Sequence, residues 1–384
     1  MDDISIYFNV KKHYRMRQRE TIQNLPKGAI ALTDVEKFII DHQLIQYSRK
    51  NLLMATKRRI ASLLPLINAK HIKSRKLVDS DLVYSWGAII TNNKPYVIEL
   101  DNPTSLTFYN WGAIKNPVTK HIIKNRLMEN RCRKIICISE ACKEGVGKIF
   151  GKTALAKCEV VYPFAKPDFT KKRKQNEVRL LFISTQFYLK GGKELLIAFE
   201  KIGKKFPNAR LTVISNTPKE IIEKYREMPG ITFMEANVSK ERLLSEIYPS
   251  CDIFVLPTYK DSFGLVLLEA LSRGLPIVAT DLYAIPEMVK HGKNGFLIEP
   301  PIRYFEKNNL PSDRFWDEDI GKYAKEHEFP KVVERLEEYL GKLIGDEQLR
   351  KSMADASKEI FLERFSEKTR MEKMEKILGE AAEG

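Results

Sequence analysis

Residues 257–276, PTYKDSFGLVLLEALSRGLP, form the stretch from which the fold can be read. Apolar runs rich in β-branched and aromatic residues lie on both sides of it, at 251–256 and at 276–280. Short runs of this kind are typical of strands. Between them, Asp261 or Ser262 can cap a helix that a glycine and a proline then end. The stretch therefore predicts a strand, a loop, a helix and a second strand.

Two carboxylates in this stretch are candidate ligand-binding groups. Glu269 lies in a helix that is apolar nearly all round, where a carboxylate is unfavourable unless it has hydrogen-bond partners such as ligand hydroxyls. Asp261 lies in the loop before the helix, where backbone N–H groups and the helix dipole favour an anion such as phosphate. Because roughly 12 Å of helical rise separates them, we expect them to hold different parts of one ligand and not to form a glycosidase pair. The alternative is an N-cap aspartate and an incidental glutamate.

The segment from Asp261 to Glu269, with Ala270 and the Gly-Leu-Pro at 274–276, resembles the E-x7-E segment of retaining glycosyltransferases of family 4, the glycosyl transferases group 1. Asp261 stands where that pattern usually has its first Glu. The resemblance implies the GT-B fold, an α/β architecture of two facing Rossmann-like domains with a deep interdomain cleft. It also implies that Asp261 holds hydroxyls of the donor sugar and Glu269 the ribose. Retention would proceed by departure and attack on one face of the sugar, without a metal or other cofactor.

A second candidate loop follows the apolar run 178–184. Its two glycines, 191 and 192, allow the backbone to approach an anion closely, and an anion there would offset the unfavourable lysine at a helix N-terminus. By the resemblance, Lys190 matches the lysine that grips the donor diphosphate, whereas Thr185 stands where the family usually has Arg. The donor-binding residues that we expect are Ser184, Thr185, Lys190, Gly191, Ser262, Phe263, Gly264, Leu265 and Glu269.

Asp101 is the candidate from the first half of the chain. Residues 95–102 resemble the family's strand that ends at the active-site cleft, and Asp101 takes the place of a frequent His. It orients either a donor hydroxyl or an acceptor, or it caps the next segment. Asp261, Asp101 and Lys190 are thus the expected catalytic residues. No Gly-Gly loop follows the first strand, at 9–14, and His13 is a weak candidate for contact with the donor.

The charge is distributed unevenly along the chain. Residues 1–165 hold 28 Lys and Arg against 14 Asp and Glu, whereas the remainder holds 37 against 36. Such an excess indicates an anionic partner, of which a membrane surface or lipid phosphate is favoured over nucleic acid. The stretch 46–76 reads as a basic amphipathic helix that either suits a membrane surface or packs on the sheet with a solvated face.

A length of 384 residues predicts two domains. We expect a basic acceptor-side domain, a short linker, a nucleotide-sugar-binding domain that carries an insertion, and a last helix that crosses back to the first domain. The insertion holds aromatic residues among charges, and it either shapes the acceptor site, touches lipid or is a structural flap. The expected boundaries are 1–165, 166–176, 177–365 with the insertion at 300–330, and 366–384.

Composition excludes several other classes. No apolar run reaches the length of a membrane span, and the first residues lack a signal peptide's pattern, so the expected location is the cytoplasm, with peripheral contact at the inner membrane face. Zinc or a disulfide framework is not indicated, because the five cysteines lack C-x-x-C spacing and fall in apolar segments. These cysteines are expected in the core: Cys132, Cys137, Cys142, Cys158 and Cys251.

The sequence therefore predicts a retaining hexosyltransferase of polysaccharide or glycolipid biosynthesis. It would move a hexose from a UDP- or GDP-linked donor to a glycan or a lipid-linked acceptor. A sugar-nucleotide epimerase on the same fold is one alternative, although it would need paired acid and base residues. A non-catalytic protein that binds anionic membrane or nucleic acid is the other, and it would leave the carboxylates at 261 and 269 without a role.

Overall fold

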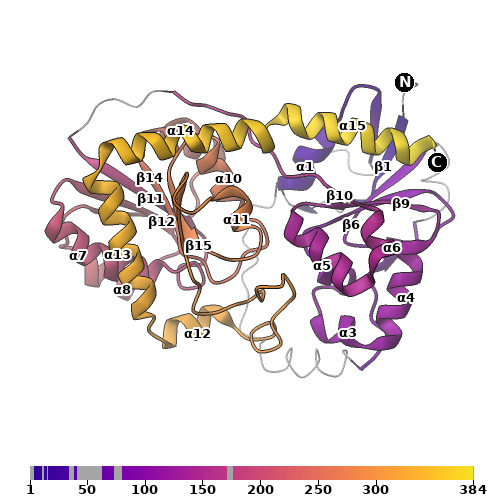
Figure 1. The fold of residues 1–384 in the computed structure, drawn as a ribbon, viewed down its shortest axis with the longest axis horizontal. Coiled ribbons are helices and arrows are strands. Elements are labelled where there is room, and N and C mark those ends of the chain that lie inside the picture. The colour runs from indigo at the N-terminus through magenta and orange to yellow at the C-terminus, as the bar shows by residue number, and fades with distance from the viewer. Residues whose placement is uncertain are drawn as a thin grey trace. The chain divides into compact units, whose positions relative to one another are not determined.

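The computed structural model describes residues 4–10, 13–14, 16–33, 39–40, 63–72, 80–170 and 176–383. The chain divides into two compact units, each with its own parallel sheet (Figure 1). The first unit comprises Met1–Pro163 and Glu367–Gly384, and the second comprises Phe164–Ser366. Both are α/β, so the predicted fold class is confirmed, whereas the cleft between the domains stays a prediction.

The first unit is built on a six-stranded parallel sheet in the order β10-β9-β8-β6-β1-β3. Two short parallel pairs, β2 with β4 and β5 with β7, lie outside it. The strands are β1 (Ile4–Phe8), β2 (His13–Tyr14), β3 (Ala29–Leu32), β4 (Ile39–Ile40), β5 (Ala69–Lys70), β6 (Leu82–Trp86), β7 (Ile89–Ile90), β8 (Tyr96–Leu100), β9 (Cys132–Cys137) and β10 (Cys158–Val160). The helices are α1 (Met16–Gln23), η2 (Pro103–Thr107), α3 (Trp111–Lys115), α4 (Pro117–Met128), α5 (Glu140–Phe150), α6 (Lys152–Ala156) and α15 (Glu367–Glu383).

The C-terminal helix α15 completes the core of this first unit. Its apolar face, including Met374 and Ile377, is buried in one cluster with Ile6 and Phe8 of β1. The buried guanidinium of Arg370 donates hydrogen bonds to the Tyr162 carbonyl at 2.8 Å and to the Thr21 hydroxyl at 3.0 Å. Burial of the apolar stripe and these hydrogen bonds tie the end of the chain to its beginning.

The second unit repeats the architecture with the strand order β13-β12-β11-β14-β15-β16, all parallel. The strands are β11 (Val178–Ser184), β12 (Ala209–Ser215), β13 (Ile231–Met234), β14 (Ile253–Leu256), β15 (Ile277–Thr280) and β16 (Gly295–Ile298). The helices are α7 (Gly192–Lys205), α8 (Lys219–Tyr225), α9 (Lys240–Arg242), the π-helical turn η3 (Leu243–Ile247), η4 (Tyr248–Ser250), α10 (Leu265–Leu271), α11 (Ile285–Met288), α12 (Ile320–Glu326), α13 (Pro330–Gly345) and α14 (Glu347–Arg364).

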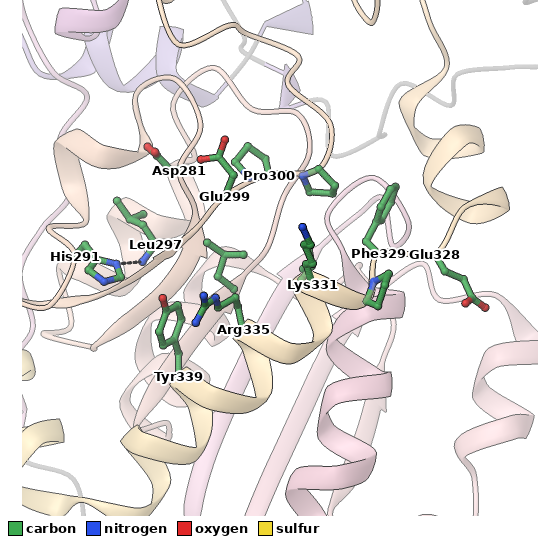
Figure 2. A pocket seen from close by; sticks show the side chains of 14 residues that line it. Asp281, His291, Leu297, Glu299, Pro300, Glu328, Phe329, Lys331, Arg335 and Tyr339 are labelled. Atoms are coloured by element: carbon green, nitrogen blue, oxygen red, sulfur yellow. Dashed lines mark hydrogen bonds between the residues drawn. The ribbon is translucent and has the colours of Figure 1, made fainter.

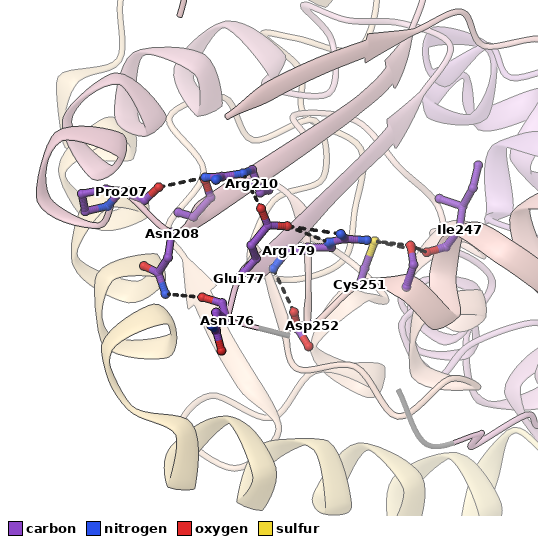
Figure 3. A network of polar contacts seen from close by, with 11 residues as sticks. Asn176, Glu177, Arg179, Pro207, Asn208, Arg210, Ile247, Cys251 and Asp252 are labelled. Carbon is purple, nitrogen blue, oxygen red and sulfur yellow. Dashed lines mark hydrogen bonds and ion pairs between the residues drawn. The ribbon is translucent and has the colours of Figure 1, made fainter. Parts of the chain in front are cut away.

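A polar network joins the amino ends of three central strands of this sheet (Figure 3). The Asp252 carboxylate, just before β14, accepts a hydrogen bond from the backbone N–H of Arg179 at 2.8 Å. Glu177 forms ion pairs with Arg179 at 3.2 Å and with Arg210 at 3.0 Å. The network thus joins the amino ends of β11, β12 and β14. The candidate residues lie at the opposite, carboxyl ends of the strands.

Three expectations about local structure need correction or lie outside the described residues. The predicted order of strand, loop, helix and strand around α10 is confirmed, but the helix is capped by Gly264 with φ 85°, not by Asp261 or Ser262. The predicted helix over 46–76 does not include 63–72, which hold Pro65 and strand β5. The rest of that stretch and the side chain of His13 lie outside the described residues.

The segment 300–330 is folded around its own aromatic side chains and is not a loose surface excursion. Trp316 and Phe305 are buried, and the ring of Tyr304 stacks on that of Trp316 with centroids 4.3 Å apart. Phe305 also stacks on Tyr283, which follows β15, at 3.8 Å. The aromatic residues therefore anchor the insertion to the carboxyl edge of the second sheet.

Candidate active site

The strand order of the second unit fixes where a ligand is expected. From β11 the chain moves outward through β12 and β13, and it then returns to β14 and moves the other way through β15 and β16. In open parallel sheets, ligands bind at the carboxyl ends of the strands that flank such a reversal. Those strands are β11 and β14, and the loops that follow them are the two that the sequence singled out.

Backbone contacts hold these two loops together. The N–H of Tyr259 donates to the Leu189 carbonyl at 3.1 Å. Gly191 has φ 74°, and a Cβ at this position would lie 2.3 Å from the Pro257 carbonyl oxygen. Only glycine allows this approach, because any side chain would force the loops apart.

The side chains of Lys190 and Asp261 meet across these loops. Lys190 Nζ lies 2.7 Å from Asp261 Oδ2, and it also donates to the carbonyl oxygen of Lys260. The second carboxylate oxygen of Asp261 accepts a hydrogen bond from the N–H of Phe263 at 3.2 Å. The resemblance assigns Lys190 to the donor phosphate and Asp261 to the donor sugar, and these two side chains are thus in direct contact.

Glu269 lies on α10, as expected, but protein groups already contact its carboxylate. The hydroxyl of the buried Tyr248 donates to Glu269 Oε2 at 3.0 Å, and Lys240 Nζ lies 3.8 Å from Oε1. Burial and then the charge of Glu269 raise the pKa of Tyr248 well above its ordinary value, so the tyrosine stays a hydrogen-bond donor. Sequence reasoning missed both partners. A π-helical turn between them, a feature frequent near functional sites, carries no readable pattern in the sequence.

The remaining expected donor residues surround this pair. Ser184 is buried at the end of β11, and its hydroxyl accepts a hydrogen bond from the Gln186 N–H at 2.9 Å. The Thr185 carbonyl accepts one from the Asn216 side chain at 3.1 Å, which links the loops after β11 and β12. Phe263 is buried, whereas Leu265 is partly exposed. Ser262 lies between Asp261 and Phe263 in the same loop.

Asp101 lies at the carboxyl end of β8 in the first unit. Its carboxylate is mostly buried and accepts hydrogen bonds from the Tyr109 hydroxyl at 3.1 and 3.2 Å. The cap of the next helix, η2, is Asn102 and not Asp101. Tyr109 and its neighbour Phe108 both have positive φ, 61° and 53°, which is rare for side chains of this size and is typical of functional loops.

Two residues before Asp101, Glu99 of β8 forms a buried ion pair. Arg17 Nε lies 3.0 Å from Glu99 Oε1, and the Tyr84 hydroxyl donates to Glu99 Oε2 at 2.5 Å. Burial alone would lower the pKa of Arg17, but Glu99 and Asp101 outweigh it and raise the pKa, so the guanidinium is charged. Sequence reasoning missed Arg17, Tyr84 and Glu99; the only available signal was the glutamate within the otherwise apolar β8.

The insertion approaches both loops of the second unit. Lys193, in the first turn of α7, donates hydrogen bonds to carbonyls at the end of α12, including Ala324 at 2.7 Å. Lys260 Nζ lies 4.1 Å from the centroid of the Tyr304 ring. The insertion thus restricts the side chain next to Asp261, which favours a structural role with influence on the site.

A separate pocket of about 890 Å³ lies at the base of the insertion (Figure 2). It is open between the ends of β15 and β16 and the start of α13, and Lys331, Arg335 and Tyr339 extend from α13 along its wall. Residues of both charges line it, including Asp281 and Glu299. Lys190, Asp261 and Glu269 are not among its lining residues, so the pocket is distinct from the loops at the strand reversal.

Other features of the described residues are consistent with an ordinary protein interior. All five cysteines are buried, as predicted, and they are not joined in disulfides. Across the described ranges, every helix is too short or too polar to cross a bilayer.

Two α/β units on parallel six-stranded sheets, with the site loops at a strand reversal, define a protein of the GT-B fold class. Residues 165–315 match the model of the family glycosyl transferases group 1. This match confirms, over that segment, the resemblance seen in the sequence.

Individual relatives show how far the likeness extends. Sulfoquinovosyl transferase SQD2 of Arabidopsis thaliana is 37% identical over 144 residues, which is 35% of this chain and 28% of that protein. The first curated relatives are matched over less than half of their length. Among solved structures, a glycosyltransferase of Rickettsia africae (TM-score 0.62, 13% identity, 99% of both chains) and Anabaena HepE bound to UDP and glucose (TM-score 0.58, 14% identity, 98% of this chain and 99% of HepE) share the fold.

Proposed function

We propose that this protein is a retaining glycosyltransferase that moves a hexose from a UDP- or GDP-linked donor to a glycan or lipid-linked acceptor. The observation that carries the proposal is the contact between Lys190 and Asp261 at the strand reversal, with Glu269 on the following helix. HepE, which has the same fold, was solved with UDP and glucose, which supports a uridine nucleotide as the first donor to test.

The chemistry required of these residues follows from the bond that breaks. Negative charge develops on the leaving diphosphate, so the site needs positive charge and N–H dipoles aimed at it. Lys190 supplies the charge, and backbone N–H groups of the loop from Ser262 to Leu265 supply the dipoles. Thr185 contributes no cation, so Lys190 contributes a larger share of the charge that stabilises the diphosphate than in relatives with Arg at this position.

The carboxylates have separate roles in this proposal. Asp261 holds hydroxyls of the donor sugar once the diphosphate occupies Lys190, and Glu269, oriented by Tyr248, holds the ribose. Asp101, oriented by Tyr109, serves the acceptor side as a hydrogen-bond acceptor for a hydroxyl. Departure of the diphosphate and attack of the acceptor hydroxyl on the same face retain the configuration of the sugar, and none of these steps uses a metal.

Calorimetry with UDP, GDP, ADP and their hexose conjugates tests the proposal, with Glu269→Ala measured in parallel. We expect one nucleotide to bind and the variant to lose it. If no nucleotide binds the wild-type protein, the proposal fails. Incubation of donor without acceptor separates the alternative, because an epimerase would return an altered sugar nucleotide.

The protein is also proposed to work at the cytoplasmic face of a membrane, in glycolipid or polysaccharide synthesis. The charge excess of residues 1–165 supports this, because it would attract the protein to anionic lipid. The same excess would serve nucleic-acid binding, but Lys190, Asp261 and Glu269 would then have no ligand.

A further inference from the structure

Four large apolar side chains of the first unit are more than half exposed. Leu63 is 77% exposed, Leu64 62%, Phe108 57% and Val118 55%. We call these four residues the apolar patch. Single exposed apolar residues are ordinary, but a group of them on one surface marks an interaction site.

Hydrogen bonds between residues 63–68 and residues 106–118 bring the patch residues together. The side chain of Asn116 donates to the Leu63 carbonyl at 3.4 Å and accepts from the Val118 N–H at 3.0 Å, so it joins these two patch residues. Farther along, the N–H of Asn68 donates to the Leu106 carbonyl at 2.7 Å. Phe108 lies two residues after Leu106, so residues 63–68 lie beside the segment that contains Phe108.

The backbone of Phe108 indicates that its exposure is imposed by the fold. Its φ of 53° and ψ of 36° are left-handed, a conformation that is unfavourable for a bulky aromatic residue. Its N–H donates back to the Thr104 carbonyl and closes η2, which holds the loop in place. The fold thus sustains strain at a residue whose ring lies in solvent, which is typical of contact loops.

The charge around the patch identifies the partner. Of the described residues, 63–72 contain one Lys and no Asp or Glu, and 102–128 contain four Lys and Arg and no Asp or Glu. Both patch segments come from these acid-free stretches. Apolar side chains among cations, with acids absent, fit the interface of a bilayer whose headgroups are anionic.

We propose that the apolar patch inserts into the surface of an anionic lipid bilayer while neighbouring lysines, Lys120 and Lys124 among them, contact its headgroups. Lys120 is exposed and Lys124 is partly exposed. Both lie on α4, which follows α3 in the first unit (Figure 1). Tyr109, next to Phe108, reaches Asp101. Docking would therefore bring the bilayer to Asp101, and this step, which rests on the proposed function, selects a lipid-linked acceptor over a free glycan.

Sedimentation with vesicles tests the docking. The probes are phosphatidylcholine vesicles with and without phosphatidylglycerol, and the test variant is Leu63→Ser with Leu64→Ser and Phe108→Asn. Asparagine tolerates the left-handed backbone, so this change removes the ring without adding strain. The control is Leu362→Ser, which removes a 52% exposed leucine from α14 in the second unit. Thermal melting checks that each variant is folded.

We expect the wild type to bind the anionic vesicles, the triple variant to bind at least about tenfold more weakly, and the control to bind as the wild type does. Lys120→Gln with Lys124→Gln should also weaken binding, and this loss should disappear at high salt. Equal binding of the triple variant and the wild type would overturn the proposal. So would self-association of the wild type that the triple variant loses, since the patch would then cover a second copy.

Nucleotide binding separates this proposal from the proposed function. The triple variant should bind the same nucleoside diphosphate as the wild type, because none of its three positions lies in the second unit. Loss of vesicle binding with nucleotide binding intact supports docking. Vesicle binding by a protein that binds no nucleotide would leave docking standing and defeat only the proposed sugar transfer.

Discussion

The ammonium group of Lys190 and the carboxylate of Asp261 lie 2.7 Å apart and join the loops that follow β11 and β14. The side chains are only 18% and 19% exposed, so solvent screens the pair weakly. A diphosphate that binds Lys190 must displace or share this carboxylate. Under the proposed function the ion pair therefore competes with the diphosphate, and its displacement would free Asp261 for the sugar.

This competition predicts opposite effects of two variants on nucleotide affinity. Lys190→Met removes a charge-assisted hydrogen bond to phosphate and should weaken UDP binding by about ten- to a hundredfold. Asp261→Asn removes the competing charge, so UDP should bind as well as before or better, while turnover of the sugar nucleotide falls. Calorimetry and product formation measure the two effects. Equal loss of UDP affinity in both variants would show that the carboxylate helps to hold the phosphate.

Gly191→Ala should destabilise the protein and disrupt the site together. The new Cβ would lie 2.3 Å from the Pro257 carbonyl oxygen on a backbone with φ 74°. We expect a loss of more than about 3 kcal/mol in the free energy of unfolding, because backbone strain alone accounts for about 1–3 kcal/mol. Gly292→Ala is the matched control, with φ 78° and open space around the new Cβ. Denaturant unfolding should show the smaller loss there, and similar losses would mean that the approach to Pro257 is unimportant.

Tyr248→Phe should weaken nucleotide binding through Glu269. The hydroxyl donates to the Glu269 carboxylate at 3.0 Å and to the Val266 carbonyl at 3.2 Å, and its loss leaves a mostly buried carboxylate less satisfied. We expect about 1–3 kcal/mol of lost stability and a weaker affinity for nucleosides that retain the ribose. Lys240→Gln should have a smaller effect, because its ammonium lies 3.8 Å from Glu269 and is a third exposed. Unchanged nucleotide affinity in Tyr248→Phe would argue against a ligand role for Glu269.

Asp101→Asn should lower turnover without a change in nucleotide affinity. The amide keeps the shape of the side chain but loses the charge that attracts an acceptor hydroxyl, so we expect kcat to fall by about a hundredfold. Tyr109→Phe should reproduce part of this loss because the hydroxyl orients Asp101. Steady-state kinetics with a saturating donor measures both. A parallel loss of UDP affinity would place Asp101 with the donor instead.

Local chemistry made much of the second unit predictable. Its apolar runs are short and bounded by turn residues, which indicates strands. The loops that contain Lys190 and Asp261 have residue patterns that are specific to the family the sequence resembles. The strand reversal between β11 and β14, however, depends on the order of strands in the sheet, which the apolar runs do not encode. The predicted cap of α10 was wrong for a related reason. Asp261 is bound by Lys190, which is 71 positions away in the chain, and Gly264 is the N-cap of the helix.

Tertiary partners account for what the sequence could not show in the first unit. Asp101 was predicted from its position at a strand end, but Tyr109 reaches it from a loop in which two residues adopt a rare backbone conformation. Arg17 meets Glu99 from a helix 82 positions away in the chain. The apolar patch was invisible too, since Leu63 and Val118 look like core residues until their exposure is known.

Glu194 predicts how stability changes with pH. This carboxyl is buried in the first turn of α7, and burial raises its pKa above the ordinary value of 4.5, although Lys193 Nζ lies 3.5 Å away and favours the charged form. The folded state therefore holds the proton to higher pH than the unfolded state does. Stability from this group is complete below pH 4.5 and is lost as pH rises through the higher, folded-state pKa.

Glu194→Gln removes this titration and keeps the shape of the side chain. The variant should gain stability over the wild type as pH rises above 4.5, and the gain should level off once the wild-type carboxyl is ionised in both states. Urea unfolding at a series of pH values measures this difference. Glu200→Gln, on the same helix but partly exposed, is the control, and its stability should change with pH as that of the wild type does. If the stability of Glu194→Gln has the same pH dependence as the wild type's, the fold does not shift the pKa of Glu194. If the variant is less stable at neutral pH, the fold stabilises the charged carboxylate, and burial does not govern it.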